Sequence, residues 1–262
     1  MNTMTIDNLK SIKADRKKFA SITAYDFSFA SLIDNAGIEV TLVGDSLGNV
    51  IQGHGTTLPV SVDEMAYHTA NVARGITSSL VLSDMPFMSY STVPAALENA
   101  AVLMQAGAQM VKLEGGEWLV ETVYSLTQRG IPVCGHLGLT PQSVHKLSGF
   151  KVQGKESNAA EKMLAEAKML EDAGADLLVV ECVPSSLGKT LAETLEIPVI
   201  GIGAGPDTDA QVLVLQDILG ISSRQPKFSK NYIEQASSIQ DALTSYRQEV
   251  LSGAFPSKEH GF

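Results

Sequence analysis

Short segments that are apolar throughout recur along the chain, separated by amphipathic segments and glycine-rich turns. Eight of the apolar segments are predicted as strands, and they cover residues 19–25, 40–44, 80–83, 110–113, 131–135, 176–180, 198–202 and 211–216. Strands that do not alternate between apolar and polar residues are typical of parallel sheets that helices cover on both faces. The pattern therefore predicts an α/β fold with a parallel sheet.

Apolar residues three and four positions apart predict helices between these strands. The predicted helices cover residues 5–13, a segment between Asp26 and Gly37, and residues 61–74, 94–105, 117–128, 159–172, 185–195 and 237–251. This alternation is typical of a (β/α)8 barrel (TIM barrel), and we predict one barrel domain, 1–262, with an extra N-terminal helix. An open doubly wound sheet is the alternative, but the glycine cluster at 201–205 follows the seventh strand and lacks GxGxxG spacing. That cluster fits an anion site or a tight turn equally well.

The composition excludes several classes of partner. The chain of 262 residues has a net charge of −10 and a pI near 4.9, without a basic stripe, so nucleic acid and anionic membranes are not expected to bind. Cys134 and Cys182 both end apolar runs, and two such thiols do not predict a disulfide framework. No signal-peptide pattern and no apolar run of roughly 20 residues is present, so we expect a soluble, cytoplasmic protein.

Acidic residues end four of the predicted strands or follow them directly: Asp45, Asp84, Glu114 and Glu181. The carboxyl ends of barrel strands converge at one mouth, where active sites lie. His136 lies at such an end, and Lys112 lies two residues before Glu114, on the same face of its strand. An acid after a strand often caps the next helix instead, and Asp26 and Asp217 fit that role. The full set at successive strand ends is harder to explain by capping and favours a functional site.

Several carboxylates in one cleft repel one another unless a cation neutralises them, so the set favours a metal site. Carboxylate oxygens without a His/Cys cluster suit Mg²⁺ or Mn²⁺ better than zinc, and His136 could be a ligand or could bind substrate. A divalent ion held by few protein groups leaves room for an α-keto acid, whose enolate it would stabilise. Lys112 would neutralise the developing oxyanion, and Glu181 would abstract the proton. A Schiff-base role for Lys112 comes second, because neighbouring carboxylates favour its charged form.

Eight motifs follow one another along nearly the whole chain. They are ITAYD (22–26), VGDSLG (43–48), DMPF (84–87), VKLEGG (111–116), GHLGLTPQ (135–142), FKVQG (150–154), ECVP (181–184) and IGIGAG (200–205). In this order and spacing the chain closely resembles the ketopantoate hydroxymethyltransferase (3-methyl-2-oxobutanoate hydroxymethyltransferase) family. One departure is Ser148, where the family more often has glycine, and residues after about 222 match less distinctively.

The resemblance implies an activity in pantothenate and coenzyme A biosynthesis. Family members transfer a hydroxymethyl group from 5,10-methylenetetrahydrofolate to 3-methyl-2-oxobutanoate (α-ketoisovalerate), giving 2-dehydropantoate (ketopantoate). They are known as barrels that assemble into homodecamers, so we expect a homodecamer.

The resemblance also implies roles for individual residues at matching positions. Asp45 and Asp84 would bind Mg²⁺, or another divalent ion such as Mn²⁺, Co²⁺ or Zn²⁺, and Glu114 would reach the ion directly or through water. The keto acid would lie against a set of residues that is shared in part with the metal: Asp45, Ser46, Asp84, Lys112 and His136. Glu181 would be the base that removes the C3 proton.

Two other functions remain open from the sequence. A lyase of the phosphoenolpyruvate mutase or isocitrate lyase type would share the fold and metal chemistry, and VCGH (133–136) partly matches the Lys-Lys-Cys-Gly-His loop of that group without its paired lysines. A catalytically inactive barrel kept for assembly or regulation is the third reading, against which the intact set of acids argues.

Overall fold

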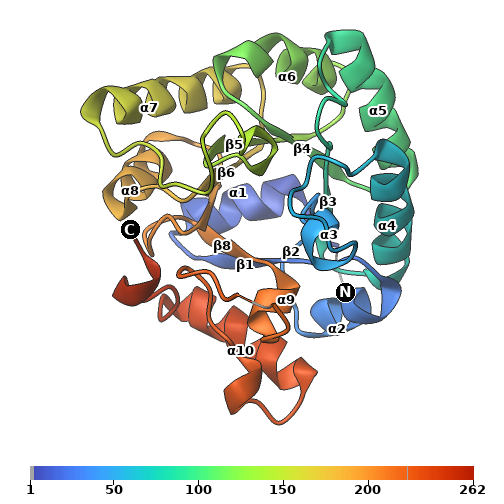
Figure 1. Cartoon of the computed structure of the whole chain (residues 1–262), viewed down its shortest axis with the longest axis vertical. Helices are drawn as coiled ribbons and strands as arrows, with labels where there is room; N and C mark the ends of the chain where they lie inside the picture. Colours follow the sequence, from blue (N-terminus) through green and yellow to red (C-terminus); the bar gives the residue numbers. More distant parts are fainter. Residues whose placement is uncertain (1–2, 223) are drawn as a thin grey trace.

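A closed barrel of eight parallel strands forms the centre of the molecule, which the computed structural model describes at residues 3–222 and 224–262 (Figure 1). The strands are β1 (Phe19–Thr23), β2 (Val40–Val43), β3 (Leu80–Asp84), β4 (Met110–Glu114), β5 (Val133–Gly138), β6 (Leu177–Glu181), β7 (Val199–Ile202) and β8 (Ala210–Leu213). Each strand pairs in parallel with the next along the chain, and β8 pairs with β1. The predicted (β/α)8 barrel is confirmed.

Helices surround the strands, as Figure 1 shows. They are α1 (Ile6–Ala14), α2 (Phe27–Asn35), α3 (Leu47–Val50), α4 (Val62–Gly75), α5 (Val93–Gln105), α6 (Val120–Thr127), α7 (Ser157–Asp172), α8 (Ser185–Thr194), α9 (Leu215–Ile218) and α10 (Ile239–Ser252). Two starts follow directly from the sequence. Asp26 caps α2 by accepting a hydrogen bond from Phe29 N–H at 3.0 Å, and Ser61 forms a capping box with Glu64 at the start of α4. None of the helices in the described residues is long and apolar enough to cross a membrane.

The last part of the barrel differs from the prediction. Residues 203–209, all described, connect β7 to β8 without a helix, and no helix was predicted between these two strands. The predicted eighth strand, 211–216, ends at Leu213, and Leu215 instead begins the short helix α9. Asp217 lies inside α9 and does not cap it. The chain leaves the strand because Leu215 N–H donates to Thr23 Oγ1 on β1, at 2.9 Å.

The barrel interior is filled by side chains from alternate positions of the strands, such as Leu80 and Leu82 on β3. Helix α1 covers its amino-terminal end. Leu9 of α1 is fully buried in the interior cluster. Lys10 and Lys13 pair with acids that immediately precede β6 and β8. The opposite, carboxyl-terminal end is therefore the one left for chemistry.

Candidate active site

The polar side chains at the carboxyl ends of the strands lie in a layer next to the apolar cluster of the barrel interior. Leu82, Met110 and Cys134 are the last residues of that cluster on their strands. Two residues further along the same strands stand Asp84, Lys112 and His136. Because side chains alternate along a strand, these three also point into the barrel. The strand register pairs Asp84 with Lys112 and Glu114 with His136, which brings residues distant in sequence side by side.

Lys112 lies at the centre of this layer and is 3% exposed. Its Nζ is 3.0 Å from Asp84 Oδ1, 3.8 Å from Glu114 Oε1 and 3.2 Å from His136 Nδ1. Burial acts to lower the pKa of Lys112, but the surrounding carboxylates outweigh it and raise that pKa above its usual range. The side chain is thus held as an ammonium, which suits charge stabilisation and not Schiff-base formation.

Each of the three buried carboxylates has one oxygen held by an amide N–H. Asp84 Oδ2 accepts from Asp45 N–H at 3.0 Å, and Asp45 Oδ2 accepts from Gln142 Nε2 at 2.9 Å. Glu114 Oε2 accepts from Gln142 N–H at 3.0 Å. The second oxygens are less well satisfied: buried Asp84 Oδ1 has Lys112 Nζ at 3.0 Å but no hydrogen bond of good geometry.

The carboxylates carry more negative charge than the site neutralises. Burial, then the charges of Asp84 and Glu114, raise the pKa of Asp45 well above its usual range, and burial also raises that of Asp84. Burial acts to raise the pKa of Glu114 as well, but His136 and Lys112 outweigh it and lower that pKa. An additional cation beside Asp45 and Asp84 would relieve this repulsion.

The donor set fits a hard divalent cation. Its atoms are carboxylate oxygens, the ligands of Mg²⁺ and Mn²⁺. Among the described residues no group of three or more His, Cys, Asp or Glu side chains is arranged as a ready metal site. Mg²⁺ is usually held by only one or two carboxylates, with water or substrate completing its shell. Asp45 and Asp84 would supply those two, and all three ligand assignments, Asp45, Asp84 and Glu114, stay predictions.

His136 connects Glu181 to the cluster. The ring is 3% exposed, with Nδ1 at 3.4 Å from Glu114 Oε1 and Nε2 at 3.4 Å from Glu181 Oε2. Burial and Lys112 act to lower the pKa of His136, but the carboxylates of Glu114 and Glu181 outweigh them and raise it to about 9. Glu181 ends β6 and its side chain is 14% exposed, so it lies at the edge of the buried layer.

Ser46 does not cap a helix. Its side chain makes no capping hydrogen bond to α3, and its Oγ lies 2.8 Å from Tyr25 Oη. A Cβ at Gly44 would approach Ser46 Oγ to 2.7 Å, so glycine lets the chain fold tightly here. The capping alternative is also wrong for Asp45, whose carboxylate bonds to Gln142.

Sequence reasoning missed the functional environment of Tyr25, Tyr90 and Gln142. Tyr90 and Gln142 are 4% and 6% exposed, although both lie outside the predicted strands and helices. Tyr90 Oη donates to Gln142 Oε1 and lies 3.3 Å from both the carbonyl oxygen and the N–H of Glu114. Gln142 stands inside the GHLGLTPQ motif, and its place there was the available signal.

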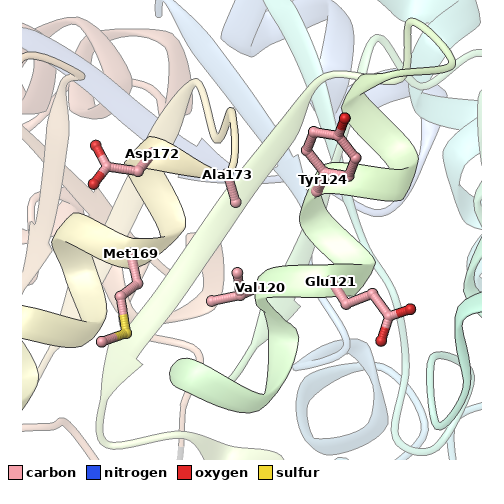
Figure 2. A pocket seen from close by; sticks show the side chains of 6 residues that line it. All are labelled: Val120, Glu121, Tyr124, Met169, Asp172 and Ala173. Atoms are coloured by element: carbon pink, nitrogen blue, oxygen red, sulfur yellow. The ribbon is translucent and has the colours of Figure 1, made fainter.

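Two other regions contribute no groups to this site. At the glycine cluster, a Cβ on Gly203 would meet Phe262 and Phe228, and one on Gly205 would meet Ser185, so close packing accounts for these glycines and favours the tight-turn reading. A surface groove of about 470 Å³ lies between α6 and α7 (Figure 2). It is lined by Val120, Glu121, Tyr124, Met169, Asp172 and Ala173, none of which is a predicted site residue.

Comparison with known proteins agrees with the sequence motifs. The family model for ketopantoate hydroxymethyltransferase matches residues 3–258. A 3-methyl-2-oxobutanoate hydroxymethyltransferase of Shewanella sediminis is 59% identical over 263 residues, covering 100% of both chains. Among solved structures, a phosphoenolpyruvate phosphomutase from Streptomyces platensis has a TM-score of 0.62 at 12% identity, covering 82% of each chain. A 2,3-dimethylmalate lyase has a TM-score of 0.60 at 13% identity, covering 84% of this chain and 81% of that one. The last two show a shared fold alone.

Proposed function

The chain belongs to the ketopantoate hydroxymethyltransferase family, and from that premise we propose that it transfers a hydroxymethyl group from 5,10-methylenetetrahydrofolate to 3-methyl-2-oxobutanoate, giving ketopantoate. The observation that carries the proposal is the buried layer of Asp45, Asp84, Glu114, Lys112 and His136, with Glu181 beside it. Such a layer of charged side chains is costly to bury, and groups of this kind cluster at functional sites.

Mg²⁺ is the proposed metal, with Asp45 and Asp84 as its ligands and Glu114 near it. When bound, the ion would supply Lewis-acid polarisation of the keto acid oxygens. The excess negative charge around Asp45 supports a cation at this place.

The remaining roles follow from where the chain's own groups lie. The ammonium of Lys112 would offset the negative charge that develops on the C2 oxygen as the C3 proton leaves. Ser46 Oγ and Tyr25 Oη, 2.8 Å apart, share one hydrogen bond, and the hydroxyl that accepts in this pair would donate its own hydrogen to the substrate carboxylate. Burial of the layer excludes water and strengthens these interactions.

Glu181 is the proposed base. The C3 proton would pass to a Glu181 carboxylate oxygen, and C3 would then attack the methylene carbon of the donor. Overall, water supplies the hydroxyl oxygen of the product and tetrahydrofolate leaves. His136 Nε2, 3.4 Å from Glu181 Oε2, would help to hold that carboxylate in place at the edge of the buried layer.

Family membership also supports a place in pantothenate and coenzyme A biosynthesis, assembly as a homodecamer and a cytoplasmic location, and we include these in the proposal. Analytical ultracentrifugation would count the subunits.

The proposal is tested by incubating the protein with both substrates, with Mg²⁺ or with EDTA, and detecting ketopantoate by mass spectrometry. We expect product with Mg²⁺ and none with EDTA. Cleavage of 2-methylisocitrate is assayed in parallel. Cleavage without hydroxymethyl transfer would favour the lyase alternative, and no Mg²⁺-dependent turnover of either kind would favour an inactive barrel.

A further inference from the structure

We propose that Gln142 is a positioning residue that fixes the orientation of two carboxylates, Asp45 and Glu114, from a loop outside their strands. The inference rests on the proposed function, because it concerns how that site is held for a divalent cation. Gln142 follows β5, in the segment after Gly138, whereas Asp45 follows β2 and Glu114 ends β4. One residue therefore connects three separate βα segments of the barrel mouth.

The carboxamide of Gln142 can adopt only one orientation. Its Nε2 donates to Asp45 Oδ2 and to the carbonyl oxygen of Met85, both at 2.9 Å. Its Oε1 accepts from Tyr90 Oη. Rotating the amide by half a turn would place Oε1 against two acceptors and lose both donated bonds, so the network defines which atom is nitrogen.

The backbone of Gln142 holds the second carboxylate. Its N–H donates to Glu114 Oε2 at 3.0 Å, and Pro141 fixes the turn that aims it there. Tyr90 reinforces the same side, because its hydroxyl lies 3.3 Å from the Glu114 carbonyl oxygen and N–H. Gln142 thus supplies two of the three amide donors that hold the buried carboxylates.

The hydrogen bonds from Gln142 determine which carboxylate oxygen of Asp45 is left available to a cation. Gln142 holds Oδ2 of Asp45, and among the described residues no hydrogen bond or ion pair reaches Asp45 Oδ1. A carboxylate with one oxygen fixed presents the other in a single direction, so a cation would meet it without reorienting the side chain. Gln142 itself is 6% exposed and its amide donors are already used, so it acts through Asp45 and Glu114.

The test compares wild type with Gln142→Met. This variant keeps the length of the side chain and removes the side-chain hydrogen bonds to Asp45, Met85 and Tyr90, while the backbone N–H bond to Glu114 stays. Mn²⁺ serves as the probe, and its binding is measured by electron paramagnetic resonance of the free ion, beside the melting temperature of the metal-free protein. We expect the dissociation constant for Mn²⁺ to rise by about 10- to 100-fold. Gln153→Met is the matched control, since that side chain lies in the same segment and, among the described residues, bonds only to the Lys151 carbonyl oxygen; the Mn²⁺ affinity of this variant should not change.

A second variant and a second measurement keep the inference refutable. Tyr90→Phe removes the donor to Gln142 Oε1 and should weaken Mn²⁺ binding in the same direction, even if Gln142→Met folds poorly. A crystal structure of the metal-free Gln142→Met protein should show the Asp45 carboxylate rotated or in two orientations. An unchanged Asp45 orientation, or a lower melting temperature with unchanged Mn²⁺ affinity, would overturn the inference. If wild type itself takes up no Mn²⁺, the proposed metal fails, while the Asp45 orientation still decides the role of Gln142.

Discussion

Replacing Lys112 by methionine removes the ammonium from the centre of the buried layer while keeping a side chain of similar length. Its Nζ lies 3.0 Å from Asp84 Oδ1 and 3.8 Å from Glu114 Oε1. With an effective dielectric constant of about 20, these distances correspond to attractions of about 5.5 and about 4.4 kcal/mol, which the desolvation of the ammonium offsets in part. Because the carboxylates would stay buried without this cation, we expect Lys112→Met to lower the free energy of unfolding of the metal-free protein by about 3–5 kcal/mol at neutral pH.

The loss caused by Lys112→Met should shrink as the pH falls. Burial, Asp84 and Glu114 raise the pKa of Asp45 even though Lys112 acts to lower it, so removing Lys112 should raise the pKa of Asp45 further. A carboxyl group with a raised pKa contributes stability that is complete below its unfolded pKa and is lost as the pH rises through its folded pKa. A proton can therefore replace the missing ammonium in acid.

The assay for Lys112→Met is urea unfolding in EDTA, followed by circular dichroism at neutral and mildly acidic pH and at one protein concentration. Lys189→Met is the matched control, because its ammonium lies 3.9 Å from Glu193 on an exposed helix face. We expect that control to change stability by no more than about 0.5 kcal/mol. A Lys112→Met protein as stable as wild type at neutral pH would refute the reasoning.

Three further outcomes are expected. In the metal-free protein the pKa of His136 is raised to about 9, so its stabilising contribution should be complete below about pH 6.5 and be lost as the pH rises through 9. Urea unfolding across this range should show the fall in wild type, and the same fall in His136→Gln would contradict the assignment. Arg247→Met leaves Glu39, which is 5% exposed, without its ion pair. It should cost about 2–3 kcal/mol, less than a fully buried pair because the Arg247 side chain is 32% exposed, and unchanged thermal unfolding would argue against it. Ser148 has a φ of +55°, so Ser148→Gly should gain about 0.5–1 kcal/mol, and a lower melting temperature would count against that strain.

The layer of Asp84, Lys112 and Glu114 could be predicted from the sequence because it depends on local rules. An apolar run fixes a buried parallel strand, and the two-residue period places Lys112 and Glu114 on one face. Parallel strands in a barrel then bring their carboxyl ends together whatever the loops do. The helix caps at Asp26 and Ser61 were predictable for the same reason, since their partners lie three residues away.

Features that depend on distant partners could not be predicted. Gln142 bonds to Asp45, 97 positions away in the sequence, and the residues next to Gln142 in the sequence do not indicate that partner. The end of β8 is decided by Thr23, which accepts the Leu215 N–H, so an apolar run alone suggested a longer strand. Ser46 turns toward Tyr25 and away from the helix end it was free to cap. In each case tertiary contacts choose between local options of similar energy.

Deuterium exchange at C3 of 3-methyl-2-oxobutanoate, followed by proton NMR without the folate donor, tests most directly whether Glu181 removes the proton beside a divalent cation. Wild type with Mg²⁺ should exchange. Glu181→Gln should slow exchange by about 100-fold or more while still binding Mn²⁺, and EDTA should abolish exchange in wild type. Exchange at the wild-type rate in Glu181→Gln, or exchange that persists in EDTA, would contradict the proposed chemistry.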